Sequence, residues 1–114
     1  MSDNKGYKEE KIKEWLGLAQ KAGKIAAGAA QVEALIKKKK GYLLILAQDA
    51  PGLIRKFEAW GQDADIPALI LSTKEELGQA VGGAPRGVML VLDRNLAQSI
   101  ISAGKNKSIT EVGM

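Results

Sequence analysis

The chain has 114 residues, of which 46% are hydrophobic and 4% aromatic, and it contains neither cysteine nor histidine. This is the length of a single domain, which removes roughly two-thirds of its unfolded surface from water on folding. The missing residue types exclude disulfides, thiolate nucleophiles, histidine-based triads and zinc sites built on cysteine or histidine.

Positive charge is concentrated in the first third of the chain. The net charge is +4, but residues 5–40 hold ten lysines against four glutamates, whereas residues 41–114 carry a net charge of −1. Such asymmetry indicates a polyanionic partner, with nucleic acid favoured over an acidic membrane surface. The polar first residues do not resemble a signal peptide, and no apolar run approaches the roughly 20 residues of a membrane span. We therefore expect a cytoplasmic protein without membrane contact.

The first part of the chain predicts two helices separated by a short strand. We expect a flexible tail over residues 1–7 and a helix over residues 8–22, where apolar side chains recur at helical spacing. Residues 24–27 predict a short strand. A second helix follows Gly28 and ends in four consecutive lysines, residues 37–40, because a helix C-terminus favours positive charge.

The rest of the chain alternates strands with helices. Residues 43–47 are a continuous apolar run typical of a buried strand, Asp49 followed by Pro51 predicts a helix start, and Gly61 predicts that helix's end. The next expected elements are a strand at 66–71, a helix capped by Thr73 that runs to residue 81, and a loop at 82–87. A strand at 88–92 and a helix capped by Asp93 or Asn95 follow. Gly104 ends this helix, and residues 105–114 are expected to be a flexible tail. This order predicts one α/β domain over residues 8–104, with helices on both faces of the sheet.

No pattern in the sequence indicates an enzyme. The two glycine-rich nucleotide fingerprints are absent, and GGAPRG at residues 82–87 precedes a predicted strand rather than a helix. No two carboxylates stand at an informative spacing. We therefore predict no catalytic residue, no metal site, no cofactor and no small-molecule substrate. An enzyme on an α/β scaffold stays as an alternative for which no catalytic group can be named.

The helix start after Gly28 is a candidate anion site. It places free backbone N–H groups and the positive end of a helix dipole at one point. Lys24, Arg86 and the lysines of residues 37–40 are candidate cations of the same surface. Each feature also has a simpler interpretation, because Gly28 can serve a tight turn and a lysine run can be a solvated helix end.

Three stretches resemble a known family: GAAQVEALIKKKKGYLLILAQD (28–49), DIPALILSTKEELGQAVG (65–82) and GVMLVLD (87–93). They are similar to the kink-turn RNA-binding ribosomal proteins of the L7Ae/L30e superfamily, over roughly residues 12–103. STKEELGQAVG is the most specific part, and AQKAGKI (19–25) is shared with the bacterial YlxQ-like branch. The resemblance implies a three-layer α-β-α sandwich around a four-stranded mixed sheet. It also implies a non-enzymatic RNA binder of the translation apparatus, which we expect to be a monomer.

The resemblance also implies where RNA would bind. Carried over by position, and with three lysines added on the basis of charge, the candidate residues are Lys24, Gly28, Ala29, Ala30, Gln31, Lys37, Lys38, Ala84, Pro85, Arg86, Gly87 and Val88. The family usually has Asn, Glu and Lys where this chain has Ala30, Gln31 and Ala34, and Pro51 replaces an acidic residue often found shortly after Asp49. The backbone anion site is thus kept, while most base-contacting side chains are missing.

Phosphate contacts position a protein on RNA, whereas base contacts specify the sequence. We therefore expect the partner to be a structured RNA, ribosomal RNA included. The protein would recognise the shape of this RNA, and the lysines would be electrostatic anchors flanking the helix start. The rival hypothesis is a protein-interaction module on the same fold that has lost RNA binding, and the apolar helix start Ala29–Ala30 supports it.

Overall fold

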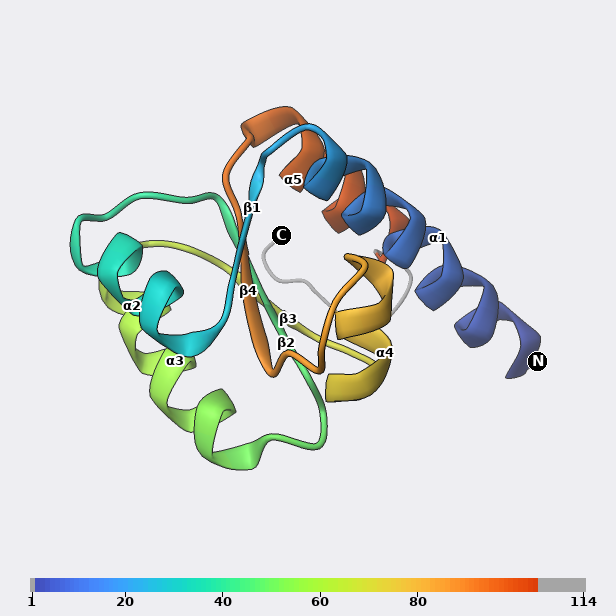
Figure 1. Cartoon of the computed structure of the whole chain (residues 1–114), viewed down its shortest axis with the longest axis horizontal. Helices are drawn as coiled ribbons and strands as arrows, with labels where there is room; N and C mark the ends of the chain where they lie inside the picture. The colour runs from blue at the N-terminus through green and yellow to red at the C-terminus, as the bar shows by residue number, and fades with distance from the viewer. Residues whose placement is uncertain (1, 105–114) are drawn as a thin grey trace.

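The computed structural model describes residues 2–104, which form five helices and a four-stranded sheet (Figure 1). The elements are α1 (Ser2–Lys21), β1 (Ile25–Ala27), α2 (Ala29–Lys37), β2 (Leu43–Leu46), α3 (Pro51–Asp63), β3 (Ala68–Ile70), α4 (Lys74–Ala80), β4 (Val88–Val91) and α5 (Arg94–Ala103). The tail predicted over residues 105–114 lies outside the described residues. Among these helices, none is both long enough and apolar enough to cross a bilayer.

The sheet has the order β1-β4-β2-β3 and is mixed. Strand β4 pairs antiparallel with both β1 and β2, and β2 pairs parallel with β3. Every residue of the two central strands, β2 and β4, is buried. This burial explains why both strands are continuous apolar runs in the sequence, because a strand covered on both faces has no polar side.

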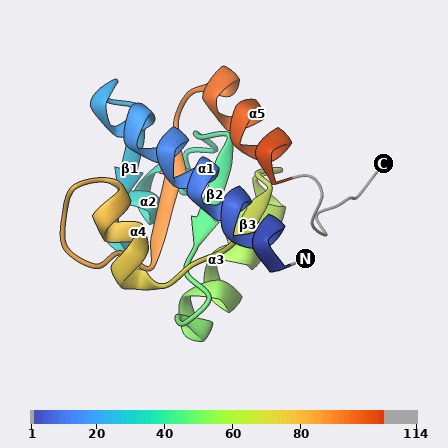
Figure 2. The same cartoon turned by 90° about the vertical axis from the view of Figure 1, so that its right-hand side faces the viewer.

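Helices cover both faces of the sheet. In the view of Figure 1, α2 and α3 lie on one side and α1, α4 and α5 on the other, and Figure 2 looks onto the second group. Strand β2 sends Leu43 and Ile45 into the core with α1, α4 and α5, and it sends Leu44 and Leu46 into the core with α2 and α3. This alternation follows from the two-residue period of a strand. The predicted three-layer sandwich with a four-stranded mixed sheet is confirmed.

Two element ends differ from the predictions. Helix α1 begins at Ser2, so residues 2–7, predicted as a tail, are helical backbone. A formed helix extends at low cost, because each added residue gains a hydrogen bond. Helix α3 continues past Gly61 to Asp63. A β-carbon at Gly61 would lie 2.9 Å from the Ile66 carbonyl oxygen, so this glycine permits close packing and does not end the helix.

Three predicted helix caps had different outcomes. Thr73 and Asp93 are confirmed, since each accepts a hydrogen bond from the backbone N–H three residues later, at 3.2 Å and 2.9 Å. Asp49 does not cap α3, whose N-cap is Ala50. Its carboxylate instead accepts from the N–H of Lys74 at 2.9 Å, because β2 and β3 are parallel and bring the starts of α3 and α4 together.

Candidate nucleic-acid interface

Several chain segments meet at the edge of the sheet where β4 begins. Strand β4 lies between β1 and β2, and both neighbours run antiparallel to it, so both end at this edge. The Gly28 N–H donates to the Val88 carbonyl oxygen and the Ala47 N–H donates to the Gly87 carbonyl oxygen, each at 3.0 Å. The starts of α2 and α3 and the loop of residues 82–87 are therefore neighbours. The positive ends of two helix dipoles point to the same edge.

The start of α2, which we call the helix-start site (residues 28–31), is open to an anion. Gly28 is the N-cap with φ of 102°, in the left-handed half of backbone space, and it has no side chain to cap the helix. The Gly28 carbonyl oxygen accepts from Val32 at 3.0 Å, which starts the helical ladder. The N–H groups of Ala29, Ala30 and Gln31 have no backbone partner in the part of the chain that the structure describes. Such N–H groups bind phosphate or carboxylate oxygens.

The Arg86 side chain lies directly beside this helix start. A β-carbon at Gly28 would be only 3.5 Å from the Arg86 Nη1. The Arg86 Nε is buried and has no hydrogen-bond partner among residues 2–104. A cation at the positive end of a helix dipole is unfavourable unless an anion binds between the cation and the helix start. Both groups donate hydrogen bonds, so together they suit an anionic oxygen ligand; no three carboxylates within the described residues come together as a metal site would require.

Gly78 of α4 allows the loop of residues 82–87 to reach this position. A β-carbon at Gly78 would lie 2.6 Å from the carbonyl carbon of Ala84 and 2.9 Å from the Cα of Pro85. The Gly83 N–H also donates to the Gly78 carbonyl oxygen at 2.8 Å. Any larger residue would push the loop backbone off α4. This contact is the physical reason for the first of the two glycines within STKEELGQAVG, Gly78.

The other predicted residues of this edge differ in exposure. Ala30, Gln31, Ala84 and Pro85 are exposed, whereas Val88 is fully buried and its side chain belongs to the core. The Gln31 Oε1 accepts from the Ala27 N–H at 3.2 Å. The acceptor of this amide is therefore engaged with the protein's own backbone. Its NH₂ group is the part that can donate to a ligand.

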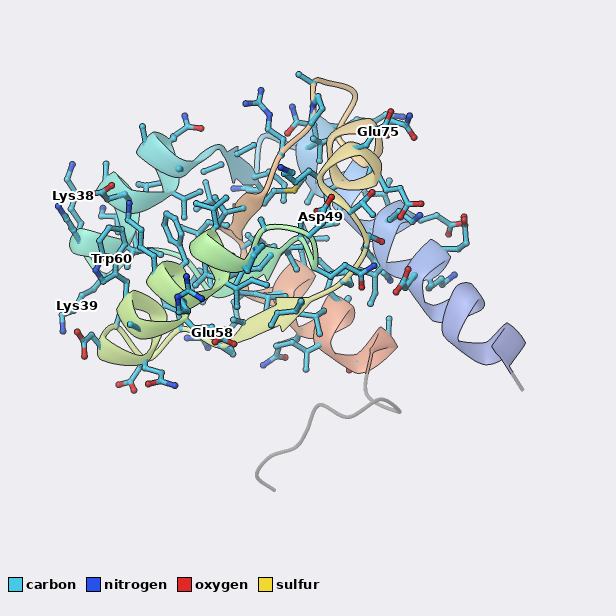
Figure 3. All side chains as sticks on the ribbon, turned by 90° about the horizontal axis from the view of Figure 1, so that it is seen from below. Lys38, Lys39, Asp49, Glu58, Trp60 and Glu75 are labelled. Atoms are coloured by element: carbon cyan, nitrogen blue, oxygen red, sulfur yellow. The ribbon has the colours of Figure 1, made fainter. Side chains whose placement is uncertain are left out.

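The predicted lysines lie elsewhere. Lys24 precedes β1 and Lys37 ends α2, so both are at the opposite edge of the sheet from Gly28, and α2 alone separates its two ends by about 13 Å. The lysines therefore do not flank the helix-start site as expected. Figure 3 shows Lys38 and Lys39 on the side of Trp60, away from Asp49 and Glu75. Lengths of helix and strand, applied to the sequence, would have been enough to separate these groups.

Lys37 is also engaged within the protein. Its Nζ lies 2.9 Å from the Glu33 Oε2 and 5.6 Å from the centre of the Trp60 ring. The hydrogen bond from Lys37, aided by its charge, lowers the pKa of the Glu33 carboxyl below the ordinary value of a glutamate. An ammonium with these partners is less available to an external anion than a solvated lysine.

The architecture is shared with solved structures. A protein of unknown function from Bacillus halodurans is 26% identical, with a TM-score of 0.78 over 82% of this chain and 95% of that chain. The Giardia lamblia 15.5kD RNA binding protein is 18% identical, with a TM-score of 0.74 over 84% of this chain and 86% of that chain, which is a likeness of fold. The model of the Ribosomal protein L7Ae/L30e/S12e/Gadd45 family matches residues 10–101, and the chain belongs to this family.

Proposed function

We propose that this protein binds structured RNA without catalysing a reaction, and that an RNA phosphate occupies the helix-start site. The observation that carries the proposal is the Arg86 guanidinium, which lies beside the uncapped start of α2 with its buried Nε unpartnered among residues 2–104. A phosphate accepts from guanidinium and backbone N–H groups at once. Membership of a ribosomal protein family and the fold shared with an RNA binding protein of Giardia lamblia support RNA as the source of that phosphate.

Recognition then depends on the shape of the RNA more than on its bases. Ala30 and Ala34 are exposed and offer no polar atom, and the acceptor of Gln31 is bonded to Ala27. We infer a kink-turn-like or ribosomal RNA as ligand, bound by a monomer in the cytoplasmic translation apparatus. The AQKAGKI segment favours the YlxQ-like branch of the family.

Replacing Arg86 tests the site directly. Arg86→Met removes the charge and keeps most of the side-chain length. A hydrogen bond to a charged group contributes ~1.5–3 kcal/mol, so affinity for a kink-turn hairpin should fall by about tenfold to a hundredfold. The slope of log affinity against log salt should fall by about 0.9, the value for one phosphate contact with a duplex. The measurement is a fluorescence anisotropy titration at several salt concentrations.

Lys11→Met is the matched control for the loss of charge. It removes one positive charge from α1, which covers the face of the sheet opposite α2. It should change affinity by less than about threefold, the loss expected from general electrostatics at a distance. Equal losses in the two variants would show that only net charge matters. Unchanged binding by Arg86→Met would remove the helix-start site from the interface.

Restoring the family's side chains tests the specificity. The triple variant Ala30→Asn, Gln31→Glu and Ala34→Lys leaves net charge unchanged and retains an acceptor for the Ala27 N–H. A polar base contact contributes ~1–3 kcal/mol in DNA complexes. Two regained contacts, reduced by the misfit that the surrounding loop imposes, should raise the preference for a kink-turn over a plain duplex by about tenfold to several hundredfold.

The two proteins and the two RNAs are titrated at one salt concentration. A strong preference for the kink-turn in the unmodified protein would show that backbone amides and the loop of residues 82–87 are sufficient for specificity. Absence of binding by either protein to either RNA would favour the protein-interaction module, for which the apolar helix start Ala29–Ala30 is the specific observation.

A further inference from the structure

A pocket lies at the opposite end of α2 from the helix-start site. It has a volume of about 420 Å³ and is lined by Leu35, Lys39, Lys40, Gly41, Tyr42 and Leu92; we call it the Tyr42 pocket. Tyr42 precedes β2 and Leu92 follows β4, and the Tyr42 N–H donates to the Val91 carbonyl oxygen at 2.9 Å. The volume is within the range of pockets that bind small molecules.

Positive charge surrounds the Tyr42 pocket. Lys39 and Lys40 line it, and the guanidinium carbon of Arg94 lies 5.9 Å from the centre of the Tyr42 ring. None of these three cations forms an ion pair with another residue that the structure describes. The neighbouring Asp93 carboxylate accepts a hydrogen bond from the Leu96 N–H and forms no ion pair with these cations within residues 2–104. Uncompensated like charges in one place favour an anionic ligand.

Lys39 has a backbone conformation that favours glycine. Its φ is +57°, in the left-handed region, where a β-carbon is strained. The N–H of Lys39 donates to the Ile36 carbonyl oxygen at 2.8 Å, and that of Lys40 donates to the Leu35 carbonyl oxygen at 3.0 Å. This is the Schellman motif, in which the left-handed residue is usually glycine. Stability alone would therefore favour glycine at residue 39.

Tyr42 adds an aromatic surface to this charge. The residue is 44% exposed, although aromatic residues are only 4% of the chain. Exposed aromatic rings beside cations are the usual means of binding unpaired nucleotides, because every base has a face that stacks. We propose that the Tyr42 pocket binds a single-stranded segment of RNA, with a base stacked on Tyr42 and the flanking phosphates bound by Lys39, Lys40 and Arg94.

This proposal rests on the proposed function, because one RNA would contact both ends of α2. The nine residues of α2 span about 13 Å. A stacked strand advances about 3.4 Å per nucleotide, so roughly four nucleotides connect the helix-start site to the pocket. The Tyr42 pocket therefore suits an unpaired extension of the structured element held at the helix-start site.

The experiment compares three RNAs: a kink-turn hairpin, the same hairpin with a six-nucleotide uridine extension (about the connecting length plus a bound base), and the same hairpin with an abasic extension of equal length. Stacking contributes ~1–3 kcal/mol per base, so the uridine extension should raise affinity for the unmodified protein by about fivefold to a hundredfold. The abasic extension keeps the phosphates and loses the bases. It should yield a smaller gain, which high salt removes.

Two substitutions of Tyr42 separate stacking from packing. Tyr42→Leu removes the aromatic face and should abolish the difference between uridine and abasic extensions, while affinity for the bare hairpin stays within about twofold of the unmodified protein. Tyr42→Phe keeps the ring and should retain the gain. Because Tyr42 is exposed, neither change opens a cavity in the core.

Two glycine substitutions test the strained lysine. Lys39→Gly should raise the melting temperature by roughly 2–6 °C as strain is relieved, and should lower the salt slope for the uridine-extended hairpin by about 0.7, one single-strand phosphate contact. Lys38→Gly is the matched control. It removes the same charge at φ of −94°, where glycine relieves no strain, so its melting temperature should not rise.

The outcomes separate the two proposals. Binding of the extended RNA but not of the bare hairpin would support the Tyr42 pocket and reject the proposed helix-start function. Binding of the bare hairpin with no gain from the extension would support the helix-start function and reject the Tyr42 pocket. A full gain from the abasic extension, or equal gains in Tyr42→Leu and Tyr42→Phe, would overturn base stacking. If the extension adds nothing and a glutamate-rich peptide binds in a Tyr42-dependent way, the pocket serves a protein partner and the proposal is overturned.

Discussion

Replacing Gly78 by alanine tests whether the contact between α4 and the loop of residues 82–87 positions Arg86. The new methyl group would lie 2.6 Å from the Ala84 carbonyl carbon and 2.9 Å from the Pro85 Cα. Ordinary carbon contacts are about 3.5–4.0 Å, so the loop backbone must move by roughly 1 Å. Overpacking of this kind costs ~1–3 kcal/mol, and the better helix propensity of alanine offsets ~1 kcal/mol. The free energy of unfolding should therefore fall by ~0–2 kcal/mol.

The effect on RNA binding should exceed the effect on stability. A shift of roughly 1 Å takes a hydrogen bond out of its distance range, and the contact at risk is the one we propose between Arg86 and an RNA phosphate. We expect at least about a tenfold loss of affinity for the kink-turn hairpin. Urea unfolding gives the stability and anisotropy titration gives the affinity.

Gly52→Ala in α3 is the control for helix propensity, because a β-carbon there would meet no atom within 4 Å. It should raise the free energy of unfolding by up to ~1 kcal/mol. If Gly78→Ala is stabilised to the same extent and binds RNA as the unmodified protein does, the close contact with Ala84 does not hold the loop and the reasoning is refuted.

Two further predictions concern the core and the surface ion pair. Leu44→Ala and Leu90→Ala each remove a fully buried side chain from a central strand and should each lower the free energy of unfolding by ~2–5 kcal/mol; a loss below ~1 kcal/mol in urea melts would contradict this placement. By NMR titration, the pKa of Glu33 should lie below that of an ordinary glutamate and rise in Lys37→Met, which removes the hydrogen bond and the charge that lower it. The stabilising effect of the pair is present above the ordinary glutamate pKa and is lost as the pH falls through the lowered one, so the stability difference between Lys37→Met and the unmodified protein should shrink in acid.

Local patterns predicted the elements of this fold well. The apolar runs at β2 and β4 predicted central strands, and the Thr73 cap was predicted from its spacing to Glu76. Such features depend on neighbours within a few residues. The mixed character of the sheet was predicted from the family resemblance. The strand order was not predicted, because periodicity contains no information on which strands pair.

Two predictions failed because the roles of the residues depend on distant neighbours. Asp49 has the side chain and position of an N-cap, yet its carboxylate accepts from Lys74, which only the parallel pairing of β2 and β3 brings close. Gly61 was predicted as a helix end, but its role is set by the approach of Ile66. The pattern of residues likewise could not predict that the Arg86 side chain lies beside Gly28, because this position depends on the path of a loop.

The order of the strands has a consequence for how this protein is made. Strand β4 lies between β1 and β2 although it follows both in the chain. A growing polypeptide therefore carries β1 and β2 without the strand that joins them, and the sheet closes only after nearly all of the described domain has been synthesised. The Gly28 N–H acquires its partner, the Val88 carbonyl oxygen, at the same moment. The contact between Gly28 and β4 thus forms only after β4 has been synthesised, and a chain that ends before β4 has an incomplete version of the proposed RNA surface.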